Sequence, residues 1–362
     1  MYRCFPPDGS PPHNFAGPSP RFVATETMCP GCENPVASHE GPRAARRYDF
    51  PVAQAAAALV MVGQGVSYTE AADRTRVRNH RSRLVSGAQL VGNWVEVLGP
   101  VVTAEASESS WPETVVLDST WFQVRNTWTG TSSRAFSVLG AYGYPAGGPG
   151  RTWALHATPQ ARSADWQRLL RSLPGEPRMV ICDSDRAIRA AVKQVWPNSF
   201  VKLCEHHLRV RAVAALAPYG LTGYGDPVME LLNDAFHSAT DWRRFAAAVK
   251  GRGIVAEQWV KDHDEVVRAQ ARRRRHLPLH HSTGALDEVL AKVREFMEPR
   301  AFCYRNAERT NRMLELVRLR LNRADDPVAY AAAIRAHLDT HGGRLPRQGV
   351  VRDPKGQHSL RV

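Results

Sequence analysis

Residues 179–208 read MVICDSDRAIRAAVKQVWPNSFVKLCEHHL. The stretch joins a short apolar run, two aspartates one residue apart, a helical pattern and a Cys-x-x-His pair. Short apolar runs on either side of a helical segment are typical of the strand–helix–strand unit of an α/β sheet. We therefore predict a strand over 178–185, a helix over 186–197 and a further strand over 199–207.

Three more strand-like segments come before this unit. Apolar, β-rich runs cover 113–124, 135–145 and 151–159, and a helical pattern covers 163–175. Three successive strands that suit antiparallel pairing, followed by alternating helix and strand, predict one mixed α/β sheet. Residues 208–280 have mostly helical patterns and are expected to form an insertion after the fifth strand.

Two aspartates fall at positions of this sheet where a carboxylate is costly or reactive. Asp118 interrupts an apolar strand, and a buried charge needs a partner or a metal ion. Asp183 stands at the end of the fourth strand, and strand ends of α/β sheets collect reactive groups. Oxygen ligands of this kind suit Mg²⁺ or Mn²⁺.

A third carboxylate is expected on the amphipathic helix within 280–297, which Ser282 or Thr283 would cap. At about 100° per residue, Asp287 lies on the flank of the apolar stripe, whereas Glu288 faces solvent. Glu308 is a further alternative, but it points away from the apolar face of its own helix. The pattern favours Asp287 as the third acid. Asp185, the second aspartate of the DSD sequence at 183–185, is expected to cap the next helix rather than to bind metal.

The first hundred residues predict two smaller parts. Residues 1–47 are rich in Pro, Gly and Ser, and Cys29-Pro-Gly-Cys32 resembles half of a zinc site. The candidates for the other half are Cys4, Asp8, His13 and His39. The alternative is a degenerate knuckle held by local turns. Residues 48–105 have three helical patterns with a glycine turn, which suits a helix-turn-helix, or else a plain helical hairpin with a basic face. The candidate DNA contacts are Arg74, Arg76, Arg78, Arg81 and Arg83.

The charge balance favours a polyanionic partner. The chain of 362 residues has 48 Lys and Arg against 35 Asp and Glu, a formal net charge of +13. Nucleic acid is the expected partner rather than a membrane, because no apolar run approaches the ~20 residues of a spanning helix and no signal-peptide pattern is present. Six cysteines without a secretion signal fit a reducing cytoplasm better than a disulfide framework.

The order of these parts resembles the DDE transposases of the Mutator-like group and related bacterial insertion sequences. The matching stretches are VVLDSTWF, ICDSDRAIRAAVKQVWPNSFVKLCEHHL, STGALDEVLAKVRE and FCYRNAERTNRMLELVRLR. In the third acidic position the family usually has Glu, whereas this sequence has Asp287 followed by Glu288. Cys204 and His207 match the family's Cys-x-x-His, which we expect to brace the core near the site rather than to bind zinc.

The resemblance implies a domain organisation and an activity. It implies a zinc-ribbon-like segment (1–47), a helix-turn-helix domain (48–105), an RNase H-like catalytic domain (106–345) with its helical insertion (208–280), and a tail (346–362). Asp118, Asp183 and Asp287 would bind Mg²⁺ or Mn²⁺, and Zn²⁺ would bind the N-terminal cysteines. A homo-oligomer on double-stranded DNA, near the bacterial nucleoid, would cut and join strands at the ends of its own element. The alternative is an inactive or domesticated DNA-binding regulator.

Overall fold

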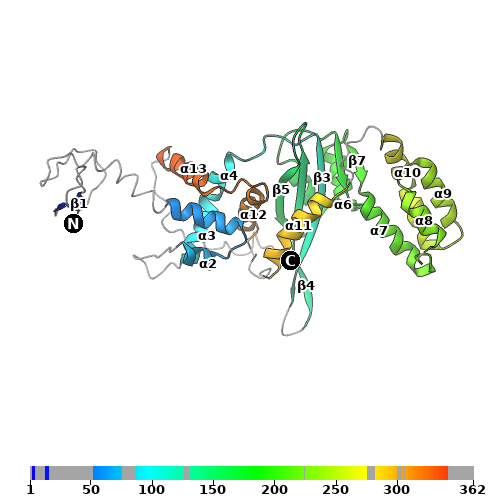
Figure 1. The fold of residues 1–362 in the computed structure, drawn as a ribbon, viewed down its shortest axis with the longest axis horizontal. Coiled ribbons are helices and arrows are strands. Elements are labelled where there is room, and N and C mark those ends of the chain that lie inside the picture. The colour runs from blue at the N-terminus through cyan, green and yellow to red at the C-terminus, as the bar shows by residue number, and fades with distance from the viewer. Residues whose placement is uncertain are drawn as a thin grey trace. The chain divides into compact units, whose positions relative to one another are not determined.

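The computed structural model of the chain describes residues 52–75, 87–125, 130–223, 225–274, 282–299, 304 and 306–340, and the backbone of 2–4 and 13–15 (Figure 1). These residues divide between two compact units. One contains the described residues up to Val62, those from Val66 to Val102, and those from Asp326 onward. The other extends from Thr103 to Asp325 and includes Gly63–Gly65. Each unit is described by itself below.

The larger unit is built on a mixed five-stranded sheet with the strand order β5-β4-β3-β6-β7. Its first three strands pair antiparallel, and β6 and β7 add in parallel. The predicted α/β class with one mixed sheet is therefore confirmed. The strands are β3 (Thr114–Arg125), β4 (Ser132–Tyr144), β5 (Arg151–Thr158), β6 (Met179–Cys182) and β7 (Phe200–Leu203).

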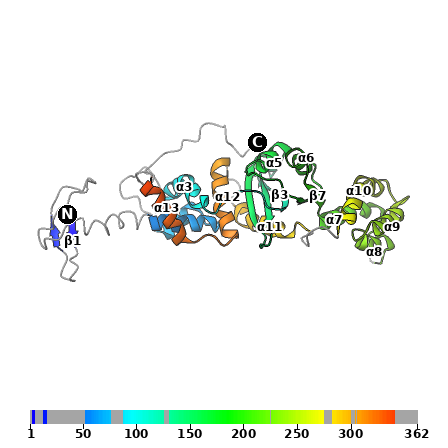
Figure 2. The same ribbon diagram turned by 90° about the horizontal axis from the view of Figure 1, so that it is seen from above.

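Helices cover both faces of this sheet. Helices α5 (Ser163–Leu170) and α6 (Arg186–Val195) lie on one face, and α11 (Gly284–Met297) lies on the other (Figure 2). The apolar faces of α5 and α6 bury Trp166, Ile188 and other side chains against the sheet in one continuous core. Asp185 caps α6 as predicted, because its carboxylate accepts a hydrogen bond from the Ala187 N–H at 2.6 Å.

One prediction in the 199–207 segment is wrong. The fifth strand ends at Leu203, and a helix already begins at Glu205, so that Cys204 is the residue before its first turn and His207 lies on the helix. An acidic residue in a first helical turn is favourable because of the helix dipole, and Glu205 provides it. The change from strand to helix turns the His207 side chain toward the sheet's carboxylates, as shown below.

The helical insertion adds a group of aromatic side chains to this continuous core. Trp242 and Phe245 are fully buried, and the Trp242 indole lies 5.9 Å from the ring of Trp259. The indole N–H of Trp242 donates to Asp264 at 2.8 Å, so the one polar atom of this side chain is satisfied. The insertion comprises α7 (Glu205–Leu216), η1 (Ala217–Tyr219), α8 (Pro227–Asp234), α9 (Ala239–Val249) and α10 (Ile254–Arg273).

Amide side chains cover both edges of the sheet. On edge strand β5, Asn322 pairs with the backbone N–H and C=O of Thr152 at 2.9 and 2.8 Å, and Asn311 pairs in the same way with Ala157 at 2.6 and 3.3 Å. Asn311 lies on α12 (Ala307–Leu321), and Asn322 is the C-cap residue of this helix. Unpaired strand edges can associate with other chains. The two amides satisfy the backbone N–H and C=O groups of Thr152 and Ala157 on this edge.

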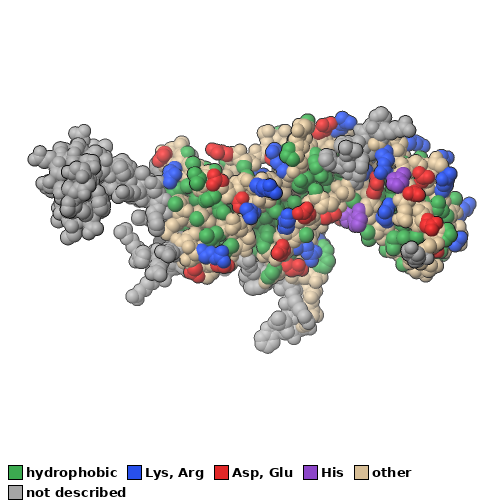
Figure 3. Space-filling view, in the orientation of Figure 1, with side chains coloured by type: hydrophobic (Ala, Val, Ile, Leu, Met, Phe, Trp, Pro, Cys, Tyr) green, Lys and Arg blue, Asp and Glu red, His purple; other side chains and the backbone are tan. Residues whose placement is uncertain are grey.

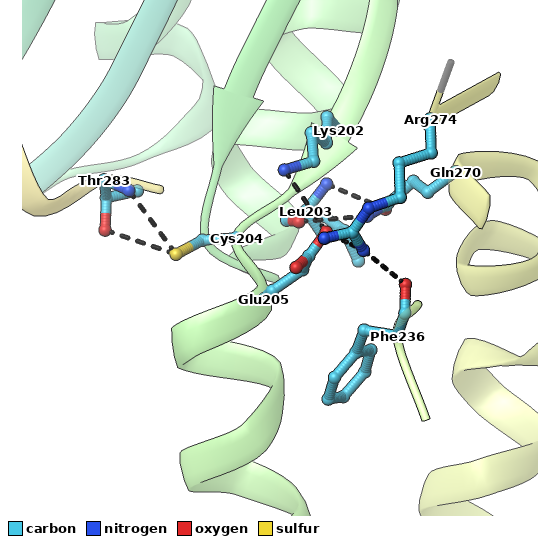
Figure 4. A network of polar contacts seen from close by, with 8 residues as sticks. All are labelled: Lys202, Leu203, Cys204, Glu205, Phe236, Gln270, Arg274 and Thr283. Carbon is cyan, nitrogen blue, oxygen red and sulfur yellow. Dashed lines mark hydrogen bonds and ion pairs between the residues drawn. The ribbon is translucent and has the colours of Figure 1, made fainter. Parts of the chain in front are cut away.

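Gln270 of α10 does the same for edge strand β7. Its side chain accepts from the N–H of Leu203 at 2.9 Å and donates to the carbonyl of Leu203 at 3.1 Å (Figure 4). Nearby, the buried Lys202 ammonium lies 3.5 Å from Glu205, and Arg274 lies 3.6 Å from the same carboxylate. The insertion is thus joined to the sheet by a buried polar network.

We expect Gln270→Leu to destabilise the larger unit. Leucine fills a similar volume but leaves the Leu203 N–H and C=O buried without partners, at a cost of about 1–3 kcal/mol for each group. Thermal unfolding followed by circular dichroism measures the loss. Gln258→Leu is the matched control, because Gln258 lies on the same helix, is exposed and pairs only with Asp262. Equal melting temperatures for the two variants would contradict the role of Gln270.

The smaller unit is helical. A helix covers residues 52–63, followed by α2 (Tyr68–Arg74), α3 (Gly87–Val97), the start of α4 (Gly99–Ala104) and later α13 (Pro327–Thr340). Ser67 caps α2 by accepting a hydrogen bond from the Glu70 N–H. Helices α2 and α3 pack together, but residues 76–86 between them are outside the described part. The helix-turn-helix therefore stays a prediction.

The zinc-ribbon prediction also stays untested. Cys29 and Cys32 lie outside the described residues, and Cys4 is described only as backbone in the pairing of β1 (Tyr2–Cys4) with β2 (His13–Phe15). Of the candidate DNA-contacting arginines, Arg74 lies on α2 and pairs with Glu70, whereas Arg76, Arg78, Arg81 and Arg83 are not described. Within the described ranges, no helix combines the length and apolarity needed to cross a bilayer.

Candidate metal centre

Asp118 lies in the middle of the sheet on β3. Its backbone is paired with Gly140 of β4, and its side chain shares a face with that of Thr120 because strand side chains alternate. Thr120 accepts a hydrogen bond from Arg294 of α11 at 3.2 Å, so this is the face that α11 covers. Asp118 is half-buried, and its carboxylate accepts the N–H of Ser119 at 2.7 Å.

Asp183 follows directly after β6, beside Asp118. Strands β3 and β6 are parallel with Leu117 opposite Cys182, so the next residues along each strand are neighbours at one end of the shared ladder. One oxygen of Asp183 accepts the N–H of Asp185 at 2.7 Å, and the other forms an ion pair with Arg211 of α7 at 2.9 Å. Asp183 thus lies beside Asp118 at the end of the parallel ladder, but it is not one of the residues whose ligand atoms lie within 4.8 Å of one another, so a cation shared by these two carboxylates stays a prediction.

Helix α11 brings Asp287 to the same place. A side chain at Gly140 would crowd this packing, because an added Cβ would lie 2.8 Å from Cδ1 of Leu286 and 3.1 Å from Cδ2 of Leu290. The bare glycine backbone opposite Asp118 lets α11 pack closely against β4. Asp287, next to Leu286 on this helix, therefore reaches the carboxylate on β3.

His207 completes the cluster. Ligand atoms of Asp118, His207 and Asp287 all lie within 4.8 Å of one another. The three side chains are half-buried and come from three elements far apart in the sequence: a central strand, the first turn of α7, and the first turn of α11. His207 was predicted to brace the core, and its position among the carboxylates was not expected.

The crowding of carboxylates shifts the pKa of Asp118. The pKa of Asp118 is raised from 3.8 to about 7: burial is the largest cause, the negative charges of Asp183 and Asp287 act in the same direction, and the Ser119 hydrogen bond and His207 act against them. A carboxyl group poised near neutrality among other acids is what a site for a cation produces when no cation balances the charge. The carboxylate oxygens of this donor set suit Mg²⁺ or Mn²⁺, whereas an imidazole nitrogen is typical of transition-metal sites.

Cys204 and Thr283 lie behind the cluster. The Thr283 N–H and hydroxyl lie 3.4 and 3.5 Å from the Cys204 sulfur (Figure 4). The Thr283 oxygen is also 3.3 Å from Nδ1 of His207 and donates to Asp287 at 2.9 Å. Burial would raise the pKa of the Cys204 thiol, but hydrogen bonds from His207 and Thr283 outweigh it and lower the pKa to about 7. The hydrogen bond to Cys204 raises the pKa of His207 to about 9, against the opposing effect of burial.

These contacts define what the Cys-x-x-His pair does. Both Cys204 and Thr283 are fully buried. The sulfur of Cys204 has hydrogen bonds with Thr283 and His207. Within the described part of the chain, the one cluster with metal-ligand geometry includes His207 but not Cys204. The pair therefore connects the end of the fifth strand to the site.

The competing acids lie away from the cluster, as expected. Glu288 pairs with Lys292 at 2.7 Å, and its side chain is 70% exposed. Glu308 pairs with Arg312, and its side chain is 60% exposed. Asp287 is thus the helix-borne acid that the fold places beside Asp118, the alternative that the helical periodicity favoured.

The capping of α11 differs from the prediction. Thr283 is the residue before the helix, yet its hydroxyl accepts no backbone N–H of the first turn. Ser282 instead accepts the N–H of Gly284 at 3.3 Å. Because the Thr283 hydroxyl points to Asp287 and His207, this side chain belongs to the site rather than to the helix cap.

No known protein family matches the sequence of this chain, and no curated protein is detectably similar to it.

Proposed function

We propose that the chain is a DDE-type transposase of a bacterial insertion sequence with an RNase H-like catalytic domain. The observation that carries the proposal is the convergence of Asp118 and Asp287, from a central strand and a helix across the sheet, with His207 beside them and Asp183 directly after the parallel neighbour strand. The five-stranded mixed sheet is compatible with that fold. The resemblance of the sequence to the Mutator-like group supports the same assignment.

The residues of the site have separate tasks in this proposal. Asp118 and Asp287 present carboxylate oxygens to a divalent cation, Asp183 adds a third acid on the β6 side, and His207 contributes a nitrogen ligand or a proton. A bound Mg²⁺ or Mn²⁺ supplies Lewis-acid polarisation of the phosphodiester and a lowered pKa of bound water. The proton that Asp118 holds near neutrality is released to solvent when its carboxylate binds a cation.

Arg211 favours a second candidate, a DNA-binding regulator without catalysis. Its guanidinium neutralises Asp183 at 2.9 Å and competes with a cation for that oxygen. Its side chain is 47% exposed, however, so it can turn toward solvent or toward a DNA phosphate when a cation binds. Arg211→Gln should strengthen binding of Mg²⁺ if the ion pair competes with it.

A plasmid assay tests the function. Purified protein is incubated with supercoiled DNA carrying the element's ends, with Mg²⁺, Mn²⁺ or a chelator. Nicking or strand transfer that needs the metal ion supports the transposase. Tight binding without cleavage under all three conditions contradicts it and favours the regulator.

We expect binding to DNA to weaken steeply with salt, because Lys and Arg contacts to phosphates release counterions. On the face shown in Figure 3, basic side chains are interspersed with acidic ones rather than gathered in one patch. End-specific contacts are expected from residues 1–98, because this segment contains the predicted helix-turn-helix. Deleting this segment should remove end-specific binding but retain weak non-specific affinity, as measured by fluorescence anisotropy at several salt concentrations. Retained end specificity would move recognition to the 208–280 insertion.

A further inference from the structure

Thr283 has more polar contacts than one hydroxyl proton can satisfy as a donor. Its oxygen lies 2.9 Å from Oδ2 of Asp287, 3.3 Å from Nδ1 of His207 and 3.5 Å from Sγ of Cys204. An ionised carboxylate accepts only, so the proton goes to Asp287. The Thr283 oxygen then accepts from Nδ1–H of His207, so Nε2 is the ring nitrogen that is left to bind a cation.

The surroundings hold this side chain in place. Thr283 is fully buried, its N–H donates to Cys204, and its carbonyl accepts the N–H groups of Leu286 and Asp287 at 2.8 and 2.9 Å. A buried, bonded backbone on both sides leaves the hydroxyl little freedom to turn away. The same residue therefore contacts the end of β7, through Cys204, and the first turn of α11.

We propose that Thr283 is a positioning residue for the cation site: its hydroxyl orients the Asp287 carboxylate and the His207 ring toward a divalent ion shared with Asp118. A residue hydrogen-bonded behind a metal ligand sets the ligand's direction, and its loss typically lowers metal affinity by about 10- to 100-fold. Asp is shorter than Glu by one methylene, so a fixed carboxylate direction matters more here than for a longer side chain. The proposal rests on the proposed function only in taking Asp287 as a ligand.

Mn²⁺ binding to the full-length protein without DNA tests the proposal. Free Mn²⁺ is measured by electron paramagnetic resonance for the wild type, Thr283→Val, Thr283→Ser and Asp287→Ala. Valine keeps the shape and removes the hydroxyl, whereas serine keeps the hydroxyl. The matched control is Thr310→Val, because Thr310 is also buried and its hydroxyl bonds only within α12, to the Asn306 carbonyl at 2.8 Å.

We expect Thr283→Val to raise the dissociation constant about 10- to 100-fold. Thr283→Ser and Thr310→Val should stay within about threefold of the wild type, and Asp287→Ala should lose the site. Higher Mn²⁺ should restore DNA cleavage by Thr283→Val but not by Asp287→Ala. If Thr283→Val does not fold, as judged by its thermal melt, Thr283→Ala compared with Thr283→Ser makes the same distinction.

Wild-type affinity in a folded Thr283→Val or Thr283→Ala would overturn the role of Thr283 and leave the proposed function standing. Weakened binding in Thr283→Ser would also overturn it, because the packing of the methyl group would then matter rather than the hydroxyl. If the variants bind Mn²⁺ with the expected order of affinities but the wild type does not cleave DNA, the proposed transposase function would be wrong. The positioning role of Thr283 would still stand. A wild type that binds no Mn²⁺ would overturn both.

Discussion

Asp287→Ala and Asp118→Asn should each lower Mg²⁺-dependent DNA cleavage by about 1,000-fold or more. Each change removes a carboxylate from a cluster whose ligand atoms lie within 4.8 Å of one another. Metal stabilisation of the transition state contributes several kcal/mol, and about 4 kcal/mol corresponds to a factor of 1,000 in rate. Cleavage of end-containing DNA, with binding measured in parallel, checks the prediction, since binding to the ends should change little.

The neighbouring acids provide the controls for this experiment. Glu288→Ala and Glu308→Ala should keep cleavage within a fewfold of wild type, because both side chains are exposed and paired with a basic residue one turn away. Asp287→Glu introduces the longer acid that the resembled family usually has, and it tests whether a longer side chain brings the carboxylate closer to the cation. If Glu288→Ala were inactive while Asp287→Ala still cut DNA, the assignment of the third acid would be wrong.

The sheet could be predicted because its sequence signals are local. Each strand of the 113–203 segment is a short apolar run, and the amphipathic α6 has its cap in Asp185. The position of Asp287 followed from the same kind of signal, since helical periodicity separated it from Glu288. These features depend on residues within a few positions of one another, and a single sequence contains that information.

The rest of the site depends on contacts between distant segments. Cys204, His207 and Thr283 are joined only by tertiary packing, and the pattern gave no reason to place His207 among the carboxylates. The predicted strand over 199–207 also missed the first turn of α7, which directs the His207 side chain toward the carboxylates. The strand pattern over 135–145 likewise gives no sign that Leu286 and Leu290 of α11 pack where a Cβ of Gly140 would lie.

The sheet edges were unpredictable for the same reason. Asn311, Asn322 and Gln270 pair with strand backbones 154, 170 and 67 residues away. Nothing in the local sequence of α10 or α12 separates these amides from exposed ones. The stretch FCYRNAERTNRMLELVRLR is part of the resemblance. In the structure, its Asn311 forms hydrogen bonds with the backbone of edge strand β5.

The raised pKa of Asp118 predicts a pH-dependent stability. Burial raises this pKa from 3.8 to about 7, so between these values the folded protein keeps a proton that the unfolded chain has released. The free energy of unfolding therefore falls as the pH rises through this window and levels off above about 7. At about 1.4 kcal/mol per pH unit, the loss is on the order of 4 kcal/mol in the metal-free protein.

Asp118→Asn should remove this loss, because the amide imitates the neutral carboxyl group. Near pH 4 the variant and the wild type should melt together, whereas at pH 8 without metal ions the variant should melt roughly 10 °C higher, at about 2–4 °C per kcal/mol for a unit of this size. Saturating Mg²⁺ should raise the melting temperature of the wild type at pH 8 and leave the variant unchanged, because a ligand stabilises only the state that binds it.

Asp226→Asn is the control, since Asp226 caps α8 through the Val228 N–H and asparagine caps equally well. Its melting temperature should follow that of the wild type at every pH. Circular dichroism melts at pH 4, 6 and 8, with chelator or Mg²⁺, separate the outcomes. Two results would contradict the role of Asp118 as a cation-binding carboxylate with a raised pKa. One is a wild type whose melting temperature rises from pH 4 to pH 8 without metal. The other is an Asp118→Asn variant whose melting temperature rises with Mg²⁺ as much as that of the wild type.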